Sequence, residues 1–223
     1  MKKLRILCLH GYHGSADVLR KQMSTLTAGL EALAEFECVD APSRARGDFG
    51  WWHAVEEDRG FANTRGPGSR RVAVRYDGWD ETCRWVVSLF ANEGPFDGVF
   101  GFSQGGALAA LLVGLRALNG KPTERQPLAF DFAILVGAFA ARDPRLAMLY
   151  ESTASYDLPS IHIIGRADSI VPSHSSRSLA SQFNCPLILE HDGGHVIAAN
   201  SDIRAQLTKF LEDRRVGRAG NAV

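Results

Sequence analysis

One serine lies in a pattern that suggests covalent chemistry. Ser103 stands at the centre of the string GFSQG, a G-x-S-x-G pattern at the end of a predicted strand over 97–101, and the small-residue run 106–110 follows it. A strand that turns sharply into a helix presents such a serine at the edge of a sheet, and the glycines remove Cβ atoms that would collide in the turn. The alternative is an ordinary glycine-containing turn. We predict that Ser103 is a nucleophile, which requires a base and an orienting acid elsewhere in the chain.

Two later loops supply residue types that suit these partners. Asp168 is the only carboxylate in the loop after the apolar run 161–164, and His195 follows two glycines after the apolar run 187–190. Parallel sheets gather their chemistry at the carboxyl ends of their strands, so the two loops are expected to meet near Ser103. We predict Asp168 as the acid and His195 as the base. An aspartate in such a loop can also serve a turn or the start of a helix, so that alternative stays open.

The spacing of two histidines raises the question of a metal site. His191 and His195 are four residues apart, but this spacing places two ligands together only on a helix, which Gly193 and Gly194 disfavour. No HExxH glutamate is present either. We expect no metal and no cofactor, and we expect His191 to pack or to cap the strand end.

The loop after the first apolar run, 4–9, is predicted to complete the site. It reads HGYHG over residues 10–14, and a backbone N–H from Tyr12 would bind a developing oxyanion together with that of Gln104. A dinucleotide-binding loop is disfavoured because the middle glycine of G-x-G-x-x-G is missing. A simple turn remains the other alternative.

Apolar runs that alternate with helical patterns predict an α/β fold. We expect a mostly parallel sheet of about six strands with helices on both faces. The expected strands are 4–9, 36–39, 97–101, 130–136, 161–164 and 187–190, and the expected helices are 15–33, 79–91, 104–118, 173–183 and 201–212. The prediction is a single domain over 1–215 with an irregular capping segment at about 41–77, followed by a frayed tail over 216–223.

Aromatic residues suggest walls for a substrate pocket. Trp51 and Trp52 lie in the segment 41–77, and they either close the core or wall an acyl pocket, with equal weight for the two interpretations. The segment from Phe139 to Tyr156, after the fourth predicted strand, would form another wall. We predict Trp51, Trp52 and Phe139 as pocket residues.

Composition and charge exclude several classes of function. The chain has 223 residues, 25 Lys and Arg against 25 Asp and Glu, and 45% hydrophobic residues, which is typical of a globular domain. Zero formal charge argues against nucleic-acid binding, and the single basic run, 65–71, is predicted to be a solvated loop. No apolar stretch reaches the roughly 18 residues of a membrane span. The first strand and the four scattered cysteines predict a cytoplasmic protein with free thiols.

These motifs together resemble the family of serine hydrolases within the α/β-hydrolase superfamily. The resemblance is carried by LCLHGYHGSADVL, GDFGWW, GPFDGVFGFSQGGALAALL, GRADSIVP and EHDGGHVIAAN, which run from residue 4 to about 200. It implies an α/β-hydrolase fold, the triad Ser103, Asp168 and His195, and oxyanion donors at Tyr12 and Gln104. The chain departs from the family where Ala198 replaces the proline that usually follows the histidine.

The resulting functional expectation is a hydrolase of small-molecule carboxylic esters or thioesters that works through an acyl-enzyme. Thioesterase activity on acyl-CoA or a carrier protein in product release, and a non-catalytic ligand-binding module, are the alternatives. We expect the substrate to have a neutral acyl portion bound in an apolar pocket. The sequence indicates neither the acyl length nor the oligomeric state.

Overall fold

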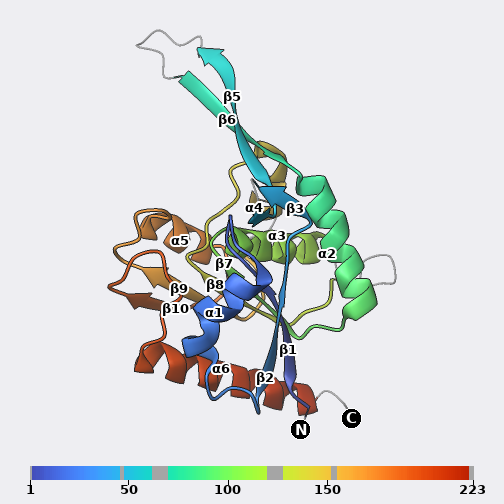
Figure 1. Ribbon diagram of the computed structural model, residues 1–223, viewed down its shortest axis with the longest axis vertical. Helices are drawn as coiled ribbons and strands as arrows, with labels where there is room; N and C mark the ends of the chain where they lie inside the picture. Colours follow the sequence, from blue (N-terminus) through green and yellow to red (C-terminus); the bar gives the residue numbers. More distant parts are fainter. Residues whose placement is uncertain (1, 46–47, 62–69, 120–127, 152–154, 221–223) are drawn as a thin grey trace.

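The computed structural model describes residues 2–45, 48–61, 70–119, 128–151 and 155–220. Its centre is a parallel sheet of six strands in the order β10-β9-β8-β7-β1-β2 (Figure 1). The strands are β1 (Leu4–Leu9), β2 (Ala34–Val39), β7 (Gly98–Phe102), β8 (Phe132–Val136), β9 (Ser160–Gly165) and β10 (Leu187–His191). The predicted fold class, a mostly parallel α/β sheet, is confirmed.

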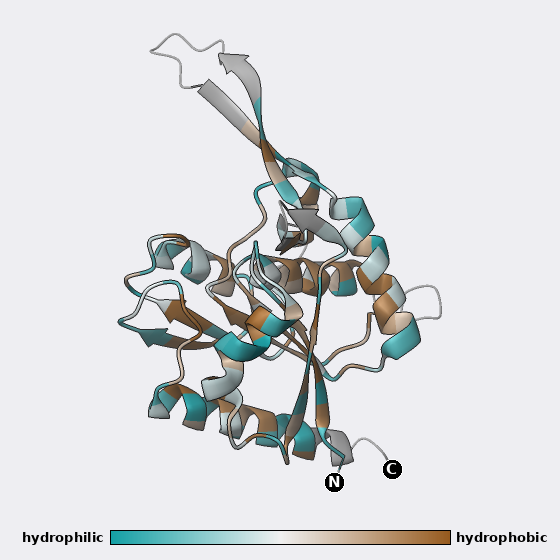
Figure 2. Cartoon of the chain, viewed as in Figure 1, coloured by the Kyte–Doolittle hydropathy of each residue, from teal (hydrophilic) through white to brown (hydrophobic). Residues whose placement is uncertain are grey.

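Helices cover both faces of this sheet. They are α1 (Ala16–Thr27), α2 (Trp79–Glu93), α3 (Gln104–Asn119), α4 (Met148–Glu151), α5 (Ser173–Ala180) and α6 (Ser201–Gly220), with a short 3-10 turn η1 (Pro144–Leu146). Alternate residues of a strand point to opposite faces. Ile6 and Cys8 of β1 therefore join the core under α1 and α6, whereas Leu7 and Leu9 join the core under α2 and α3. Figure 2 shows the hydrophobic residues concentrated along the central strands.

The order of the strands fixes where loops converge. The chain runs outward from β1 to β2, and it then returns to the other side of β1 to form β7. Open α/β sheets bind ligands at such a reversal, beyond the carboxyl ends of the strands. The loop after β1 and the turn after β7 lie side by side at this point. They hold Tyr12 and Ser103, which the sequence analysis singled out.

The segment 41–77 has more regular structure than we expected. It contains two antiparallel pairs, β3 (Ser43–Ala45) with β4 (Asp48–Gly50) and β5 (His53–Phe61) with β6 (Arg70–Asp77). Figure 1 shows the β5–β6 ribbon extending away from the main sheet. Within its described residues, only the base of the ribbon joins the core, through Val74 and Tyr76, so its strands lack the continuous apolar run that identifies a strand buried on both faces. Most of the basic run 65–71 lies outside the described residues.

Two helix ends also differ from the prediction. Helix α1 ends at Thr27 rather than near residue 33, because Ala28 leaves the helical conformation with a ψ of 125° and Gly29 follows with a left-handed φ of 86°. The N–H of Leu30 closes this turn on the carbonyl oxygen of Thr27 at 3.0 Å. Helix α6 continues to Gly220, within the tail 216–223 that we expected to be frayed, and 221–223 lie outside the described residues. Arg215 supports the last turns of α6 by donating to the carbonyl oxygen of Ala32 at 3.3 Å.

The described residues contain no helix that is long and apolar enough to cross a membrane. The four cysteines are free thiols, as the sequence analysis predicted.

Candidate active site

Ser103 occupies a strained turn between β7 and α3. Its φ of 56° is in the left-handed region, which is unusual for a residue with a side chain. The turn is so tight that a Cβ atom at Gly105 would overlap the carbonyl oxygen of Leu9, and one at Gly101 would overlap that of Gly105. Ser103 also donates its N–H to the carbonyl oxygen of Val136 at 2.9 Å, which ties the turn to β8. The glycines of the sequence pattern are therefore sterically required.

Asp168 and His195 meet in a short hydrogen bond. The Nδ1 atom of His195 lies 2.6 Å from Oδ2 of Asp168, and the two side chains are 12% and 2% exposed. The other oxygen, Oδ1, accepts the backbone N–H groups of Ile170 at 2.9 Å and Val171 at 2.8 Å. These bonds hold the carboxylate still while it orients the imidazole. An acid that orients a base in this way leaves Nε2 of the base free to accept a proton.

The imidazole of His195 packs beside the serine turn. Its ring centroid lies 4.8 Å from that of Phe102, the residue before Ser103. Gly137, directly after β8, makes room for it, because a Cβ atom at Gly137 would lie 3.1 Å from Cε1 of His195. The φ of Gly137 is 53°. Sequence reasoning missed this glycine, and its only signal was its place directly after an apolar strand.

The loop after β1 lies against the same turn. A Cβ atom at Gly11 would stand 3.3 Å from Cβ of Ser103. Among the described residues, the backbone N–H groups of Tyr12 and Gln104 have no acceptor, so both are available to a ligand. His10 fixes the loop, because its Nε2 accepts the N–H of Ala41 at 3.1 Å and its Nδ1 lies 2.7 Å from the carbonyl oxygen of Gly11. Burial lowers the pKa of His10, which favours this neutral, structural role.

The side chain of Gln104 connects the serine turn to the paired tryptophans. Its Oε1 accepts the N–H of Trp51 at 3.0 Å, and its Nε2 donates to the carbonyl oxygen of Trp52 at 2.8 Å. Trp51 is fully buried and donates its indole N–H to the carbonyl oxygen of His10 at 2.7 Å. Trp52 stacks on Tyr76, with 4.7 Å between the ring centroids. The side-chain role of Gln104 was not predicted from the sequence.

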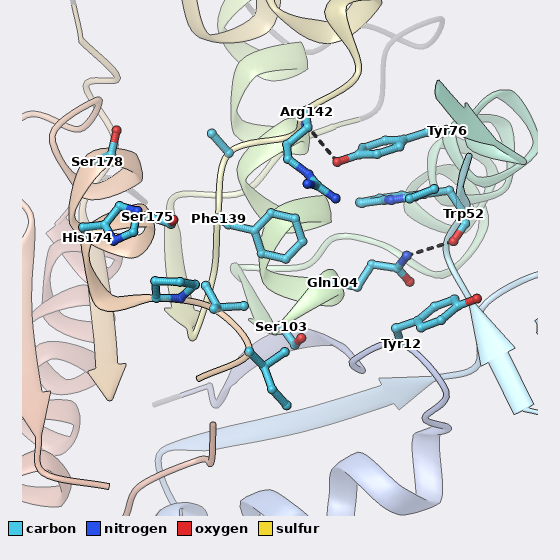
Figure 3. Close-up of a pocket in the computed structure, with 15 residues that line it drawn as sticks. Tyr12, Trp52, Tyr76, Ser103, Gln104, Phe139, Arg142, His174, Ser175 and Ser178 are labelled. Atoms are coloured by element: carbon cyan, nitrogen blue, oxygen red, sulfur yellow. Dashed lines mark hydrogen bonds between the residues drawn. The ribbon is translucent and has the colours of Figure 1, made fainter. Parts of the chain in front are cut away.

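Ser103 opens into a cavity of about 620 Å³. Its walls come from the loop after β1, the base of the β5–β6 ribbon, the loop after β8 and helix α5 (Figure 3). The lining residues are Tyr12, Trp52, Ala54, Tyr76, Ser103, Gln104, Phe139, Ala140, Arg142, Ile170, Val171, Pro172, His174, Ser175 and Ser178.

Two of the three predicted pocket residues line the cavity. Trp52 and Phe139 line the cavity, but Trp51 does not, because its indole is turned into the core and bonded to His10. Arg142 lies within the segment 139–156 that we predicted as a wall, although the sequence analysis did not single it out. The α5 side chains were missed, since polar residues on a short amphipathic helix carry no signal of a pocket.

The described residues contain no group of three or more His, Cys, Asp or Glu side chains that could hold a metal ion. His191 has a structural role instead, because its Nδ1 accepts the N–H of Gly193 at 3.1 Å and so supports the loop that carries His195. Burial lowers the pKa of His191, in keeping with a neutral acceptor.

A comparison with protein families decides the classification. Residues 1–207 match the model of the family described as serine hydrolase (FSH1). The chain belongs to this serine hydrolase family. Human esterase OVCA2 is 35% identical over 232 residues, covering 95% of this chain and 96% of the human protein. Esterase CG5412 of Drosophila melanogaster is 31% identical over 223 residues, covering 96% of this chain and 75% of the fly protein.

The fold of this serine hydrolase is also found among solved structures. The acyl-protein thioesterase 2 of Zea mays superimposes with a TM-score of 0.60 over 95% of both chains, at 20% sequence identity, which shows a shared fold. The prediction of an enzyme of the esterase type is confirmed by the family match and the curated relatives. Ala198 is partly buried and packs against the core under α1 and α6.

Proposed function

We propose that this serine hydrolase cleaves carboxylic esters or thioesters through an acyl-enzyme formed on Ser103, with His195 as base and Asp168 as its orienting acid. The observation that carries the proposal is the 2.6 Å hydrogen bond between His195 and Asp168, made beside a serine in a left-handed turn. A base that is held by a buried carboxylate next to a strained serine is the arrangement that nucleophilic catalysis needs. The fold itself does not require this arrangement.

The chemistry follows from these positions. Oγ of Ser103 attacks the carbonyl carbon while its proton passes to Nε2 of His195, and Nδ1–H remains bonded to Asp168. The N–H groups of Tyr12 and Gln104 would receive the negative charge that forms on the carbonyl oxygen. Collapse of this intermediate breaks the bond to the alcohol or thiol, which takes the proton from His195. Water then attacks the acyl-serine by the same route and releases the acid.

Kinetics on p-nitrophenyl butyrate test the proposal. Ser103→Ala should lower kcat by at least about 10³-fold, because it removes the nucleophile with which His195 and Asp168 are proposed to act. Ser24→Ala is the matched control, since Ser24 lies on α1 and its hydroxyl donates to the carbonyl oxygen of Lys21 on the same helix. Wild-type activity in Ser103→Ala would overturn the proposal.

Whether the leaving group is an alcohol or a thiol needs a separate measurement. The maize protein's name describes a thioesterase, but its likeness to this chain concerns the fold alone. Comparing kcat/KM for an acyl-CoA with that for an oxygen ester of the same acyl group distinguishes the two substrate classes. A protein that binds such esters without cleaving them would be the non-catalytic module instead.

A further inference from the structure

Among the described residues that line the cavity beside Ser103, one side chain is a guanidinium and none is a carboxylate. Its described lining residues are mostly aromatic or apolar, with the hydroxyls of α5 on one side, and Arg142 is the only Arg or Lys among them. Figure 3 shows the Arg142 side chain directed into the cavity, between Phe139 and Trp52. Within the described part of the chain, Arg142 forms no ion pair. The cavity that contains the predicted nucleophile therefore also contains a cation that pairs with no acidic side chain in the described ranges.

The backbone of Arg142 is held in place by the cavity wall. Its N–H donates to the hydroxyl of Tyr76 at 2.9 Å, and the N–H of Ala141 donates to the hydroxyl of Tyr150 at 3.2 Å. Tyr76 itself is buried and stacks on Trp52. Arg142 is thus carried on a fixed loop at the cavity edge rather than on a free surface turn.

The neighbouring acid is already occupied. Asp143 is buried, accepts the N–H of Tyr76 at 2.9 Å, and pairs with the guanidinium of Arg145 at 2.6 Å. Burial acts to raise the pKa of Asp143. The hydrogen bonds from the Arg145 side chain and from the backbone N–H groups of Tyr76 and Arg145 outweigh burial and lower the pKa to about 2. Asp143 is therefore ionised and engaged by Arg145, which leaves Arg142 to face the cavity.

We propose that Arg142 selects esters or thioesters that carry a second, carboxylate-bearing end. The proposal rests on the proposed function of Ser103 and specifies its substrate class. A guanidinium presents two parallel N–H groups that match the two oxygens of a carboxylate, and a cavity without acidic side chains does not compete for them. This differs from the neutral acyl group expected from the sequence, because the formal charge of the whole chain does not reveal a single cation placed in a pocket.

Two matched pairs of substrates test the proposal and locate the carboxylate. Mono-p-nitrophenyl adipate against p-nitrophenyl hexanoate places the charge on the acyl side. The butyrate ester of 4-hydroxybenzoate against that of 4-hydroxybenzamide places it on the leaving group. The measured quantity is the ratio of kcat/KM for the anionic ester to that for its neutral partner.

Arg142→Gln should lower this ratio about five- to tenfold in one of the two pairs, and the effect stays this modest because Arg142 is exposed to water at the cavity edge. Arg142→Lys should restore part of the ratio, since it keeps the charge and loses the paired N–H geometry. Added salt should lower the wild-type ratio towards that of Arg142→Gln. The pair that responds identifies which side of the ester carries the carboxylate.

Arg204→Gln is the control for a general change of charge, because Arg204 lies on α6 and donates to the carbonyl oxygen of Ala28, outside the cavity lining. It should keep the wild-type ratio. The proposal is overturned if Arg142→Gln leaves both ratios within about twofold of wild type. This includes the case in which kcat/KM falls equally for the anionic and the neutral ester of a pair. Wild-type protein that hydrolyses none of the four esters would instead refute the function proposed for Ser103.

Discussion

The side chain of Gln104 offers the sharpest test of how the serine turn is supported. It is 7% exposed and satisfies the N–H of Trp51 and the carbonyl oxygen of Trp52. Removing it leaves two buried backbone groups without these partners, and each unsatisfied group costs about 1–3 kcal/mol. Since the hydroxyl of Thr82 bonds to a different atom, the carbonyl oxygen of Trp51, it cannot replace either bond. We therefore expect Gln104→Ala to lower the free energy of unfolding by about 2–5 kcal/mol.

Urea unfolding measures this loss. With a slope of about 2–3 kcal/mol/M for a chain of this size, the midpoint should fall by roughly 1–2 M. Gln104→Met keeps most of the volume and removes both hydrogen bonds, so it should show most of the same loss. Gln22→Ala, at an exposed position of α1, is the matched control and should stay within about 0.5 kcal/mol of wild type. A Gln104→Met protein as stable as Gln22→Ala would refute the reasoning.

Two further outcomes concern a buried histidine and the serine turn. Burial lowers the pKa of His162 from 6.5 to about 3. Between these two pH values the unfolded chain binds a proton that the folded chain does not bind, so the free energy of unfolding decreases as the pH is lowered. The drop in unfolding free energy from pH 7.5 to pH 5 should be about 2 kcal/mol smaller in His162→Gln, and equal drops would contradict this. Gly105→Ala should abolish esterase activity, because its Cβ would overlap the carbonyl oxygen of Leu9, whereas Gly29→Ala meets no atom within 4 Å and should only lower stability, by about 1 kcal/mol.

The sheet could be predicted from the sequence because its strands are buried on both faces. Such strands read as continuous apolar runs, and the glycines around Ser103 mark a turn that other residues cannot form. The β5–β6 ribbon was not predicted, because β5 reads HAVEEDRGF, with consecutive charged residues and no regular alternation, and the alternation in β6 is limited to a few residues such as Val74 and Tyr76.

The candidate site was predictable only where its residues follow strands. Asp168 and His195 both stand just after apolar runs, so the topology brings them together. The pocket walls were harder to predict, because two neighbouring residues of the same type can point in different directions. Trp51 turns into the core and Trp52 into the cavity, and Arg142 depends on a hydrogen bond to a residue 66 positions away.

Reaction with a fluorophosphonate, followed by proteolysis and mass spectrometry, tests the central claim most directly. Such a reagent phosphonylates an activated serine hydroxyl and leaves ordinary serines unmodified. The account predicts one adduct, on the peptide that contains Ser103, and its loss in Ser103→Ala. An adduct on another residue, or hydrolysis of p-nitrophenyl butyrate by a protein that forms no adduct at Ser103, would contradict it.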